Sequence, residues 1–359
     1  MKKIDLYIYK KFIGTFFFAI AMLILIVIIF DVSENIDKFI KHEAPWQRVV
    51  VDYYLMSIPY YINLFIHLFA FITVVFFTSK MAARTEIVAI LSGGISFWRF
   101  LVPYMMAAVT IAIMSLFFGN FLIPKTNEIR RHFKDEYMER LSQSAGLNLH
   151  VQIGKDEFVY VERYSASKQY GLMFSWEKFD GSKLKYKVLA DVLYHDTVAE
   201  NSWYFDPYTI RTIVGDEETL EMGRNYHTLM NLYPKDLFKM KEDFEEMDFF
   251  ELREQIHGMR EKGSENVKEY EVEMHRRMAA PAAIIILTLI GAALSSRKVL
   301  GGIGRHLGIG ITIAFTYILF MQISKSYAIS GNLSPFMAAW TPNLIFAALG
   351  IYLLVKAPK

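Results

Sequence analysis

Cysteine is absent from this chain of 359 residues, and so are the common motifs of nucleotide-binding and hydrolytic enzymes. Without cysteine there is no disulfide framework and no thiolate metal site. The sequence contains no G-x-x-x-x-G-K-[ST] phosphate loop, no H-E-x-x-H, no G-x-S-x-G and no glycine-rich dinucleotide turn after a strand. The sequence therefore indicates no catalytic group, and it predicts neither a cofactor nor a metal site in this chain.

One short motif needs separate treatment. LSGG at residues 91–94 matches four of the five residues with which ABC ATPase domains clamp nucleotide. The fifth position holds Ile95 where the motor motif has glutamine, and the phosphate loop that would cradle the nucleotide is missing. The motif does not make this chain the motor of a transporter.

The chain also lacks an excess of either charge, because its basic and acidic residues nearly cancel to a formal net charge of +2. Such a balance argues against a nucleic-acid partner. Hydrophobic residues make up 53% of the chain and charged residues 21%, a mixture that fits neither a soluble domain nor a pure membrane bundle. The composition therefore predicts a membrane part joined to a polar part.

Long apolar runs are present, and a bilayer core needs about 20 apolar residues in a helix. Six runs are long enough: Phe12–Phe30, Tyr53–Ser79, Leu101–Pro124, Met278–Ser296, Leu307–Ser324 and Leu333–Val355. The first is too long for a signal peptide and no small-residue cleavage site follows it, so we expect an uncleaved helix. The sequence predicts an α-helical membrane protein with three spans on each side of a large insert.

Lysine and arginine are unevenly distributed among the loops, which predicts the orientation. Most of those in the short loops and at the chain ends fall on one side of the membrane: Lys2, Lys3, Lys10, Lys11, Lys80, Arg84, Arg99, Arg297, Lys298, Arg305, Lys356 and Lys359. We expect this side to be cytoplasmic, with both termini inside. The insert, from Lys125 to about Arg277, is then extracytoplasmic.

The insert has the patterns of short strands. In KLKYKVLADVLYH, the residues Leu184, Tyr186, Val188, Ala190, Val192 and Tyr194 alternate with outward-facing residues, as in a half-buried strand. DEFVYVERY and SWYFDPYTIRTI have similar patterns and are separated by turn sequences. The expected organisation is residues 1–124 with three spans, 125–277 as an all-β sandwich or jelly roll with flanking helices, and 278–359 with three more spans.

The loop between the second and third spans, SKMAARTEIVAILSGG, predicts a short helix over about residues 80–94. At 100° per residue Ala82, Glu86 and Ala89 share a narrow face from which one carboxylate projects. Ile87, Val88 and Leu91 lie on the other side, and Gly93 and Gly94 end the helix. Two interpretations stand side by side: the helix docks in a partner's groove, or it lies on the membrane surface with Arg84 reaching the headgroups.

The motif ARTEIVAILSGGIS at this place resembles the coupling segment of the LptF/LptG (YjgP/YjgQ) permease family. EMHRRMAAPAAIIILTLIGAALSSRK, MAAWTPNLIFAALG, FVYVERY and LKYKVLADVLYHD resemble other parts of that family, in the same order along nearly the whole chain. YIYKKFIGTF and NIDKFIKHE are more similar to the LptG branch than to the LptF branch.

The resemblance implies a permease subunit of an ABC transporter that extracts lipopolysaccharide from the bacterial inner membrane. The implied partners are a cytoplasmic ABC ATPase dimer that binds ATP and magnesium, a second homologous permease, and a periplasmic bridge protein. Glu86 matches the acidic residue of the coupling helix, and the insert matches the family's periplasmic β-jellyroll.

The family's substrate path is an outward-facing cavity with a gate at the first and fifth helices. Lys38 and Lys41 are candidates for the lipid phosphates, with the alternative that Asp37 pairs with Lys41 and both lysines reach the membrane interface. Glu34 and Tyr60 depart from basic residues that LptG members can carry. Candidates for the cavity wall, each of which could instead face lipid or another helix, are Phe16, Phe17, Phe18, Phe65 and Phe69.

The remaining candidates are structural. Arg276, Arg277 and Pro281 open the fourth span, and Trp340, Pro342 and Asn343 are expected to shape a kink in the sixth and to satisfy its freed carbonyls. Two other functions compete with the family reading: a non-ABC transporter that binds its substrate between helices, and a signalling or scaffold protein whose β domain binds a lipid or a protein.

Overall fold

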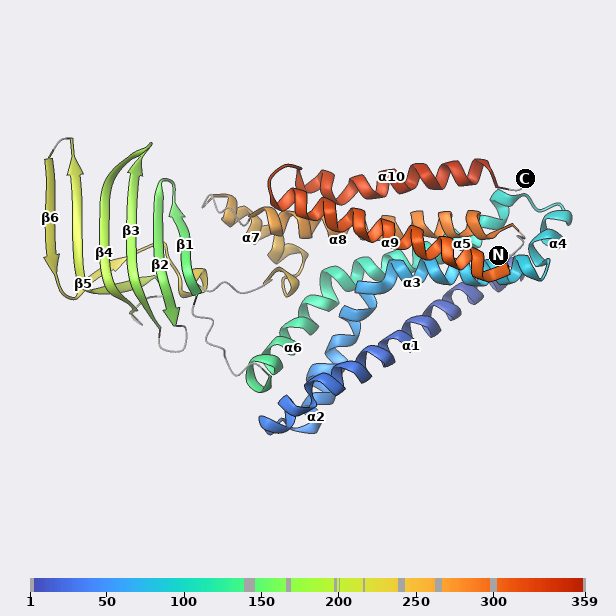
Figure 1. Cartoon of the computed structure of the whole chain (residues 1–359), viewed down its shortest axis with the longest axis horizontal. Coiled ribbons are helices and arrows are strands. Elements are labelled where there is room, and N and C mark those ends of the chain that lie inside the picture. Colours follow the sequence, from blue (N-terminus) through green and yellow to red (C-terminus); the bar gives the residue numbers. More distant parts are fainter. Residues whose placement is uncertain are drawn as a thin grey trace. The chain divides into compact units, whose positions relative to one another are not determined.

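The computed structural model describes residues 3–138, 146–165, 169–196, 199, 201–215, 217–237, 243–261, 267–297 and 302–357. Packing divides the chain into two compact units (Figure 1). A helical unit comprises residues 1–138, 244–252 and 268–359, and a β unit comprises residues 139–243 and 253–267. The β unit is thus inserted between two halves of the helical unit.

The first half of the helical unit contains three long helices. Its elements are α1 (Lys3–Lys41), α2 (Trp46–Arg48), η1 (Val49–Leu55), α3 (Met56–Ala83), α4 (Glu86–Ser92), α5 (Phe97–Phe117), η2 (Phe118–Leu122) and α6 (Ile123–Tyr137). The segments η1 and η2 are π-helical turns that continue into α3 and α6 without a break. Such wider turns occur mostly as short insertions within α-helices.

The second half follows the β strands and the short elements η3 (Pro234–Leu237), η4 (Asp243–Glu245) and α7 (Phe249–Glu261). It contains α8 (Val267–Ser295), α9 (Gly302–Ile329) and α10 (Pro335–Val355). Within the described residues, six helices are long and apolar enough to cross a membrane, three on each side of the β unit. The predicted set of six spans is confirmed.

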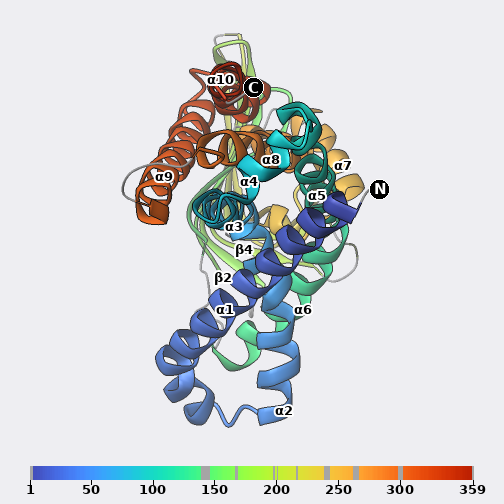
Figure 2. The same cartoon turned by 90° about the vertical axis from the view of Figure 1, so that its right-hand side faces the viewer.

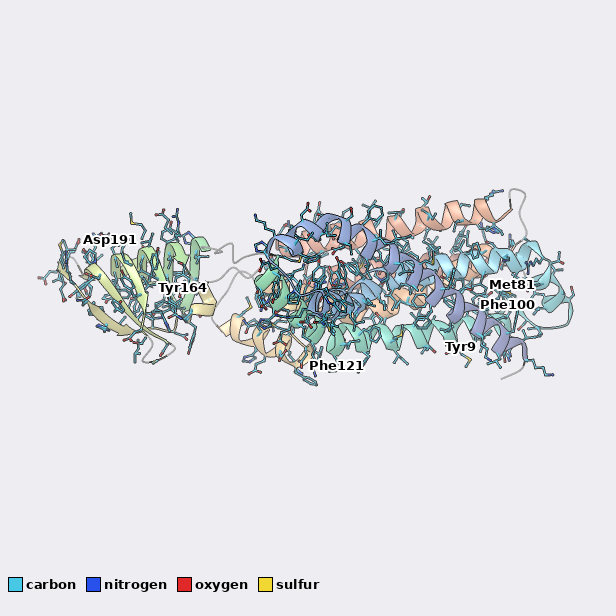
Figure 3. The ribbon with its side chains drawn as sticks, turned by 90° about the horizontal axis from the view of Figure 1, so that it is seen from below. Tyr9, Met81, Phe100, Phe121, Tyr164 and Asp191 are labelled. Atoms are coloured by element: carbon cyan, nitrogen blue, oxygen red, sulfur yellow. The ribbon has the colours of Figure 1, made fainter. Side chains whose placement is uncertain are left out.

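The core of the helical unit is apolar and aromatic. α1 packs against α3 and α5 (Figure 2), and their shared cluster includes Phe12, Phe77, Met81, Phe100 and Tyr104. Figure 3 labels Met81 and Phe100 within it. α6 extends this packing beyond the apolar run, because Phe133 is buried against Phe39 and Tyr53. The helical unit therefore continues past residue 124, where the apolar run ends.

The β unit is one antiparallel sheet. Its strands are β1 (Gly146–Gly154), β2 (Glu157–Ser165), β3 (Tyr170–Asp180), β4 (Lys183–His195), β5 (Ser202–Val214), β6 (Glu217–Gly223) and β7 (Tyr226–Leu229). The order is β1-β2-β3-β4-β5-β6, and β7 pairs with the first part of β5. The antiparallel β domain is confirmed, while its description as a jelly roll stays a prediction.

The buried residues of β4 differ at one point from the predicted alternation of inward and outward side chains. Val188 and Ala190 are buried, but the next fully buried residue is Leu193, while Val192 and Tyr194 are only half-buried. The prediction for Val192 and Tyr194 was therefore wrong by one residue. Met173, with a φ of 51°, lies in β3 between the residues paired with Ala190 and Val192. The β3–β4 register is the same on both sides of Met173, so the positive φ marks a local bend of β3 and not a shift in strand pairing.

Candidate functional site

The predicted helix between the second and third spans is broken into two. α3 ends at Ala83, and α4 begins only at Glu86. Between them Thr85 has a φ of 62°, and its hydroxyl donates to the carbonyl of Arg84. A β-branched residue in the left-handed region is strained. The direction of α4 is therefore not a continuation of α3.

This break changes the predicted face. Ala82 belongs to α3 and is buried, so it does not share an exposed helix face with Glu86 and Ala89, and that part of the prediction was wrong. Ile87 faces the core at 1% exposure, whereas Val88, predicted to lie beside it, is 55% exposed. A helix of two turns leaves only one side for the core, and Ile87 takes it.

Glu86 lies in the first turn of α4 and is partly exposed. The Tyr7 hydroxyl donates to its carboxylate over 3.2 Å, and Lys11 Nζ donates to the Tyr7 hydroxyl over 2.6 Å. Arg84 lies 3.9 Å from the same carboxylate and is itself mostly exposed. A carboxylate in the first turn also interacts favourably with the helix dipole.

The end of α4 uses the two glycines at residues 93 and 94. Gly93 follows the last helical residue, Ser92, and a Cβ there would approach the carbonyl oxygens of Ile90 and Ala89 to 3.3 and 3.4 Å. Gly94 has a φ of 81°, which side-chain-bearing residues rarely adopt. Ser96 then caps the start of α5 at Phe97, and its hydroxyl accepts from the backbone N–H of Arg99. The pair of glycines thus turns the chain from α4 into α5.

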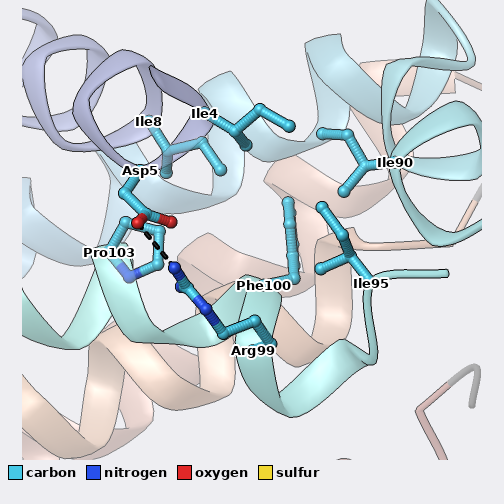
Figure 4. A pocket seen from close by; sticks show the side chains of 8 residues that line it. All are labelled: Ile4, Asp5, Ile8, Ile90, Ile95, Arg99, Phe100 and Pro103. Atoms are coloured by element: carbon cyan, nitrogen blue, oxygen red, sulfur yellow. Dashed lines mark hydrogen bonds and ion pairs between the residues drawn. The ribbon is translucent and has the colours of Figure 1, made fainter. Parts of the chain in front are cut away.

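An ion pair that the sequence did not indicate lies beside this turn (Figure 4). Arg99 Nη2 is 2.6 Å from Oδ2 of Asp5, and Asp5 is 5% exposed. The pair borders a cavity of about 20 Å³, room for about one water molecule, with Ile4 and Ile8 of α1 and Ile90 of α4 among its walls. The two residues are 94 positions apart, so no local pattern could have paired them.

The lysines predicted to contact phosphate are exposed at the C-terminal end of α1. Lys38 Nζ donates to Oδ1 of Asn35 over 2.8 Å. Among the described residues Lys41 makes no ion pair with Asp37, so the alternative of a helical pair has no support here. Both ammonium groups remain accessible.

The five phenylalanines proposed for the cavity wall fall into different environments. Phe16 is fully buried in the core, which removes it from the wall. Phe17 and Phe18 are exposed, while Phe65 and Phe69 are half-buried and contact each other edge to face. None of the five lines the cavity of about 720 Å³ between the C-terminal half of α1 and η1. Its walls are mostly aliphatic, with Ile28, Val32, Ile36, Val50 and Leu55 among them.

The chain returning from the β unit is fastened to the helical unit by charged groups. Glu273 of α8 accepts from both Arg276 and Arg277 at 2.7 to 3.0 Å. Arg277 also donates to the carbonyls of Phe244 and Met247. On the facing side Arg131 of α6 pairs with Glu246 at 2.8 Å, and Asn127 donates to the Glu245 carbonyl. This network is an anchor for the segment 244–247.

The last three helices are joined by a buried polar contact. Asn343 of α10 donates to the carbonyl of Ala279 in α8 and accepts from the Tyr317 hydroxyl of α9, at 3.0 and 2.9 Å. The carbonyl it satisfies therefore belongs to a neighbouring helix and not to its own. Trp340 is half-buried beside Phe336, and Pro342 is buried within α10. Pro281 lies well inside α8, since that helix begins at Val267 and not at the fourth apolar run.

Among the residues that the structure describes, no group of three histidine or acidic side chains is placed to hold a metal ion. The arrangement offers no catalytic geometry. It offers an acidic helix start at one end of the helical unit and an apolar cavity with nearby lysines toward the other end of α1.

The comparisons with known proteins agree with this arrangement. The model of the lipopolysaccharide export system permease LptF/LptG family matches residues 6–356. This chain belongs to the LptF/LptG family. The LptG permease protein of Haemophilus influenzae is 22% identical over 98% of both chains, and that of Escherichia coli K12 is 19% identical over 98% of both. The resemblance and its lean toward LptG are confirmed.

As an LptF/LptG family member, the chain is the permease component of a lipopolysaccharide export system and not an enzyme. It is a multi-pass membrane protein of the inner membrane with six candidate spans, and it works within a transporter complex on lipopolysaccharide.

Proposed function

We propose that this permease couples ATP hydrolysis in a separate cytoplasmic ABC ATPase dimer to the extraction of lipopolysaccharide. In this proposal it pairs with a second, LptF-like permease and passes the lipid to a periplasmic bridge protein. Both termini are cytoplasmic, residues 1–124 and 278–359 carry the spans, and the domain at 125–277 is periplasmic. The ATP and magnesium belong to the partner.

The observation that carries the proposal is the short helix α4, which presents a partly exposed carboxylate at its first residue. Glu86 and the exposed Ala89 are separated by one turn, and the small side chain of Ala89 leaves room for a groove to close over the helix. Arg84, mostly exposed beside Glu86, adds a second charge for a polar partner. Ala82 supports the helix indirectly, because it is buried at the end of α3 in the cluster that also contains Ile87.

The lipid-facing role rests on the other end of α1. Lys38 and Lys41 supply two ammonium groups suited to phosphate, and the aliphatic cavity between α1 and η1 suits acyl chains. Phe17 and Phe18, exposed on α1, and Phe65 and Phe69 on α3 supply further apolar surface for the lipid or the second permease.

The test is affinity purification of the chain from detergent-solubilised membranes, comparing the wild type with Glu86→Ala and Glu86→Lys. We expect an ABC ATPase and a second permease with the wild type, and loss of the ATPase with both variants. Glu34→Ala, an exposed acid far along α1, is the matched control and should retain the ATPase. If the wild type brings down no ATPase, the proposal fails, and a scaffold role for the β domain becomes the better interpretation.

A further inference from the structure

The N-terminal turns of α1 contact the coupling segment, defined here as residues 84–99, at two places. Asp5 pairs with Arg99 at 2.6 Å, and the Tyr7 hydroxyl donates to Glu86 at 3.2 Å. Glu86 is the first residue of α4, and Arg99 lies in the first turn of α5. The two contacts therefore bracket α4 at both of its ends.

Apolar packing fills the space between these two contacts. Ile8 and Phe12 of α1 share one buried cluster with Ile87, Phe97 and Phe100. Figure 4 shows Asp5 and Arg99 facing each other beside Phe100, with Ile90 on the facing wall. A carboxylate that is 5% exposed needs its cation, because an unpaired charge there would be costly. α1 is thus held to α4 and α5 by an ion pair, a hydrogen bond and close packing together.

The end of α3 also packs against α4, since Ile87 shares its buried cluster with Met81 and Ala82. The helix is interrupted at Arg84 and Thr85, and the left-handed Thr85 gives α4 its own direction. A backbone break of this kind is where a hinge can absorb a change of angle. α4 therefore packs on the end of α3 as well as on α1 and the start of α5, and the break at Thr85 is the point at which its angle to α3 can change.

We propose that the N-terminal end of α1 is part of the coupling segment, and that Asp5 and Tyr7 are positioning residues that make α1, α4 and the start of α5 move as one body. The proposal deepens the proposed function, on which it rests. A push by the ATPase on α4 then reaches α1 directly through the Tyr7–Glu86 hydrogen bond, and by way of α5 through the Asp5–Arg99 pair, while Thr85 allows α4 to change its angle to α3.

The first experiment measures lipid extracted per ATP hydrolysed in the reconstituted complex of all its subunits. Asp5→Asn removes the charge and keeps the shape. We expect the ATPase to remain in the complex, because Glu86 is untouched, and the amount of lipid extracted per ATP to fall about fivefold or more. The double variant Asp5→Arg with Arg99→Asp should recover part of the loss.

The matched control is Lys10→Gln, a change of one charge at an exposed position of the same helix end. It should leave the ratio of lipid to ATP at the wild-type value. A wild-type ratio in Asp5→Asn would overturn the proposal. Loss of the ATPase from the wild-type complex would instead defeat the proposed function itself, so the two failures are distinguishable.

The second experiment uses the wild-type ion pair and does not depend on variants of Asp5. The chain contains no cysteine, so spin labels can be placed at Leu6→Cys and Ser92→Cys before assembly, both at exposed positions. We expect the distance between these labels to stay the same with and without trapped nucleotide. A reference pair, Ser92→Cys and Asn332→Cys, should change its distance. A change in the first pair, or no change in either pair, would overturn the proposal.

Discussion

Charged side chains contribute differently in the two units, and burial explains the difference. In the helical unit Glu273 and Arg277 are almost fully buried, and their partners satisfy them. In the β unit the pairs are half-exposed cross-strand contacts, such as Glu177 of β3 with Lys187 of β4 at 2.7 Å. Solvent screens such pairs, so each adds little stability but responds to pH.

The hydrogen bond from Lys187 lowers the pKa of Glu177, with a smaller contribution from Ser175. A lowered folded-state pKa means that the pair stabilises the β unit above the ordinary pKa of about 4.3. That stability is lost as the pH falls through the folded-state value. We therefore expect Glu177→Gln to lower the free energy of unfolding by about 0.5–1 kcal/mol at pH 7 and by less at pH 3.

The measurement is urea unfolding of the detergent-solubilised chain, followed by tryptophan fluorescence, to which the fully buried Trp203 of the β unit contributes. Glu218→Gln, in the more exposed pair with Arg211, is the control and should have no measurable effect at either pH. A Glu177→Gln difference that grows on acidification would contradict the assigned sign.

Among the helices and strands, those with a strong hydrophobic period were predictable and the irregular ones were not. The six apolar runs gave six spans because a bilayer core admits little else. The break at Thr85 could not be foreseen, because threonine has no preference for a positive φ and only tertiary packing maintains it. The change of the buried position between Ala190 and Leu193 lies opposite Met173 of β3, whose positive φ no local sequence pattern indicates.

The candidate site was predictable only in part, for a related reason. The acidic start of α4 and its closing glycines lie within one stretch of sequence. The contacts that hold it do not: Tyr7 and Glu86 are 79 positions apart. Phe16 was predicted to line a cavity but is buried in the core. The sequence of a span does not indicate whether a phenylalanine faces lipid, substrate or another helix.

The polar contact between α8, α9 and α10 gives a prediction at this scale. Asn343→Leu removes the acceptor of the buried Tyr317 hydroxyl and the additional donor to the Ala279 carbonyl, so the hydroxyl is left unpaired. We expect a loss of about 1–3 kcal/mol in the free energy of unfolding, measured by titration with a denaturing detergent.

Tyr317→Phe alone should cost less, about 1 kcal/mol. In the double variant the hydroxyl is no longer left unpaired, so its loss should be smaller than the sum of the two single losses. Asn332→Leu, at an exposed position between α9 and α10, is the control. Strictly additive losses would show that the three groups do not act together.

Two of the candidate spans, α1 and α9, have few residues buried within the chain. In the most apolar part of each helix, only 22% of the residues of α1 and 17% of those of α9 are buried within the chain. The corresponding share in α8 is 56%. Lipid, substrate or the second permease must cover this surface in the membrane. These are the first and fifth spans, the pair that the family resemblance associates with the gate.

The proposed orientation is open to a direct test, because every cysteine introduced is the only one in the chain. In cells with a permeabilised outer membrane, an impermeant maleimide should label Glu217→Cys of β6 and leave Lys3→Cys of α1 unlabelled. Both positions are exposed, and both should react once the inner membrane is dissolved. Labelling of Lys3→Cys alone in the first condition would reverse the assigned topology.

The anchor at residues 244–247 has a consequence for how such a molecule can be assembled from parts. Arg277, Asn127 and Arg131 hold the returning chain beside α6, which ends at Tyr137, only about 9 Å of helix beyond Arg131. Residues 244–247 are therefore held between α6 and α8 by contacts within the helical unit, and none of these contacts comes from a strand. A short linker could replace residues 139–243, and a foreign domain could be grafted at the same junction, with the helical unit left intact.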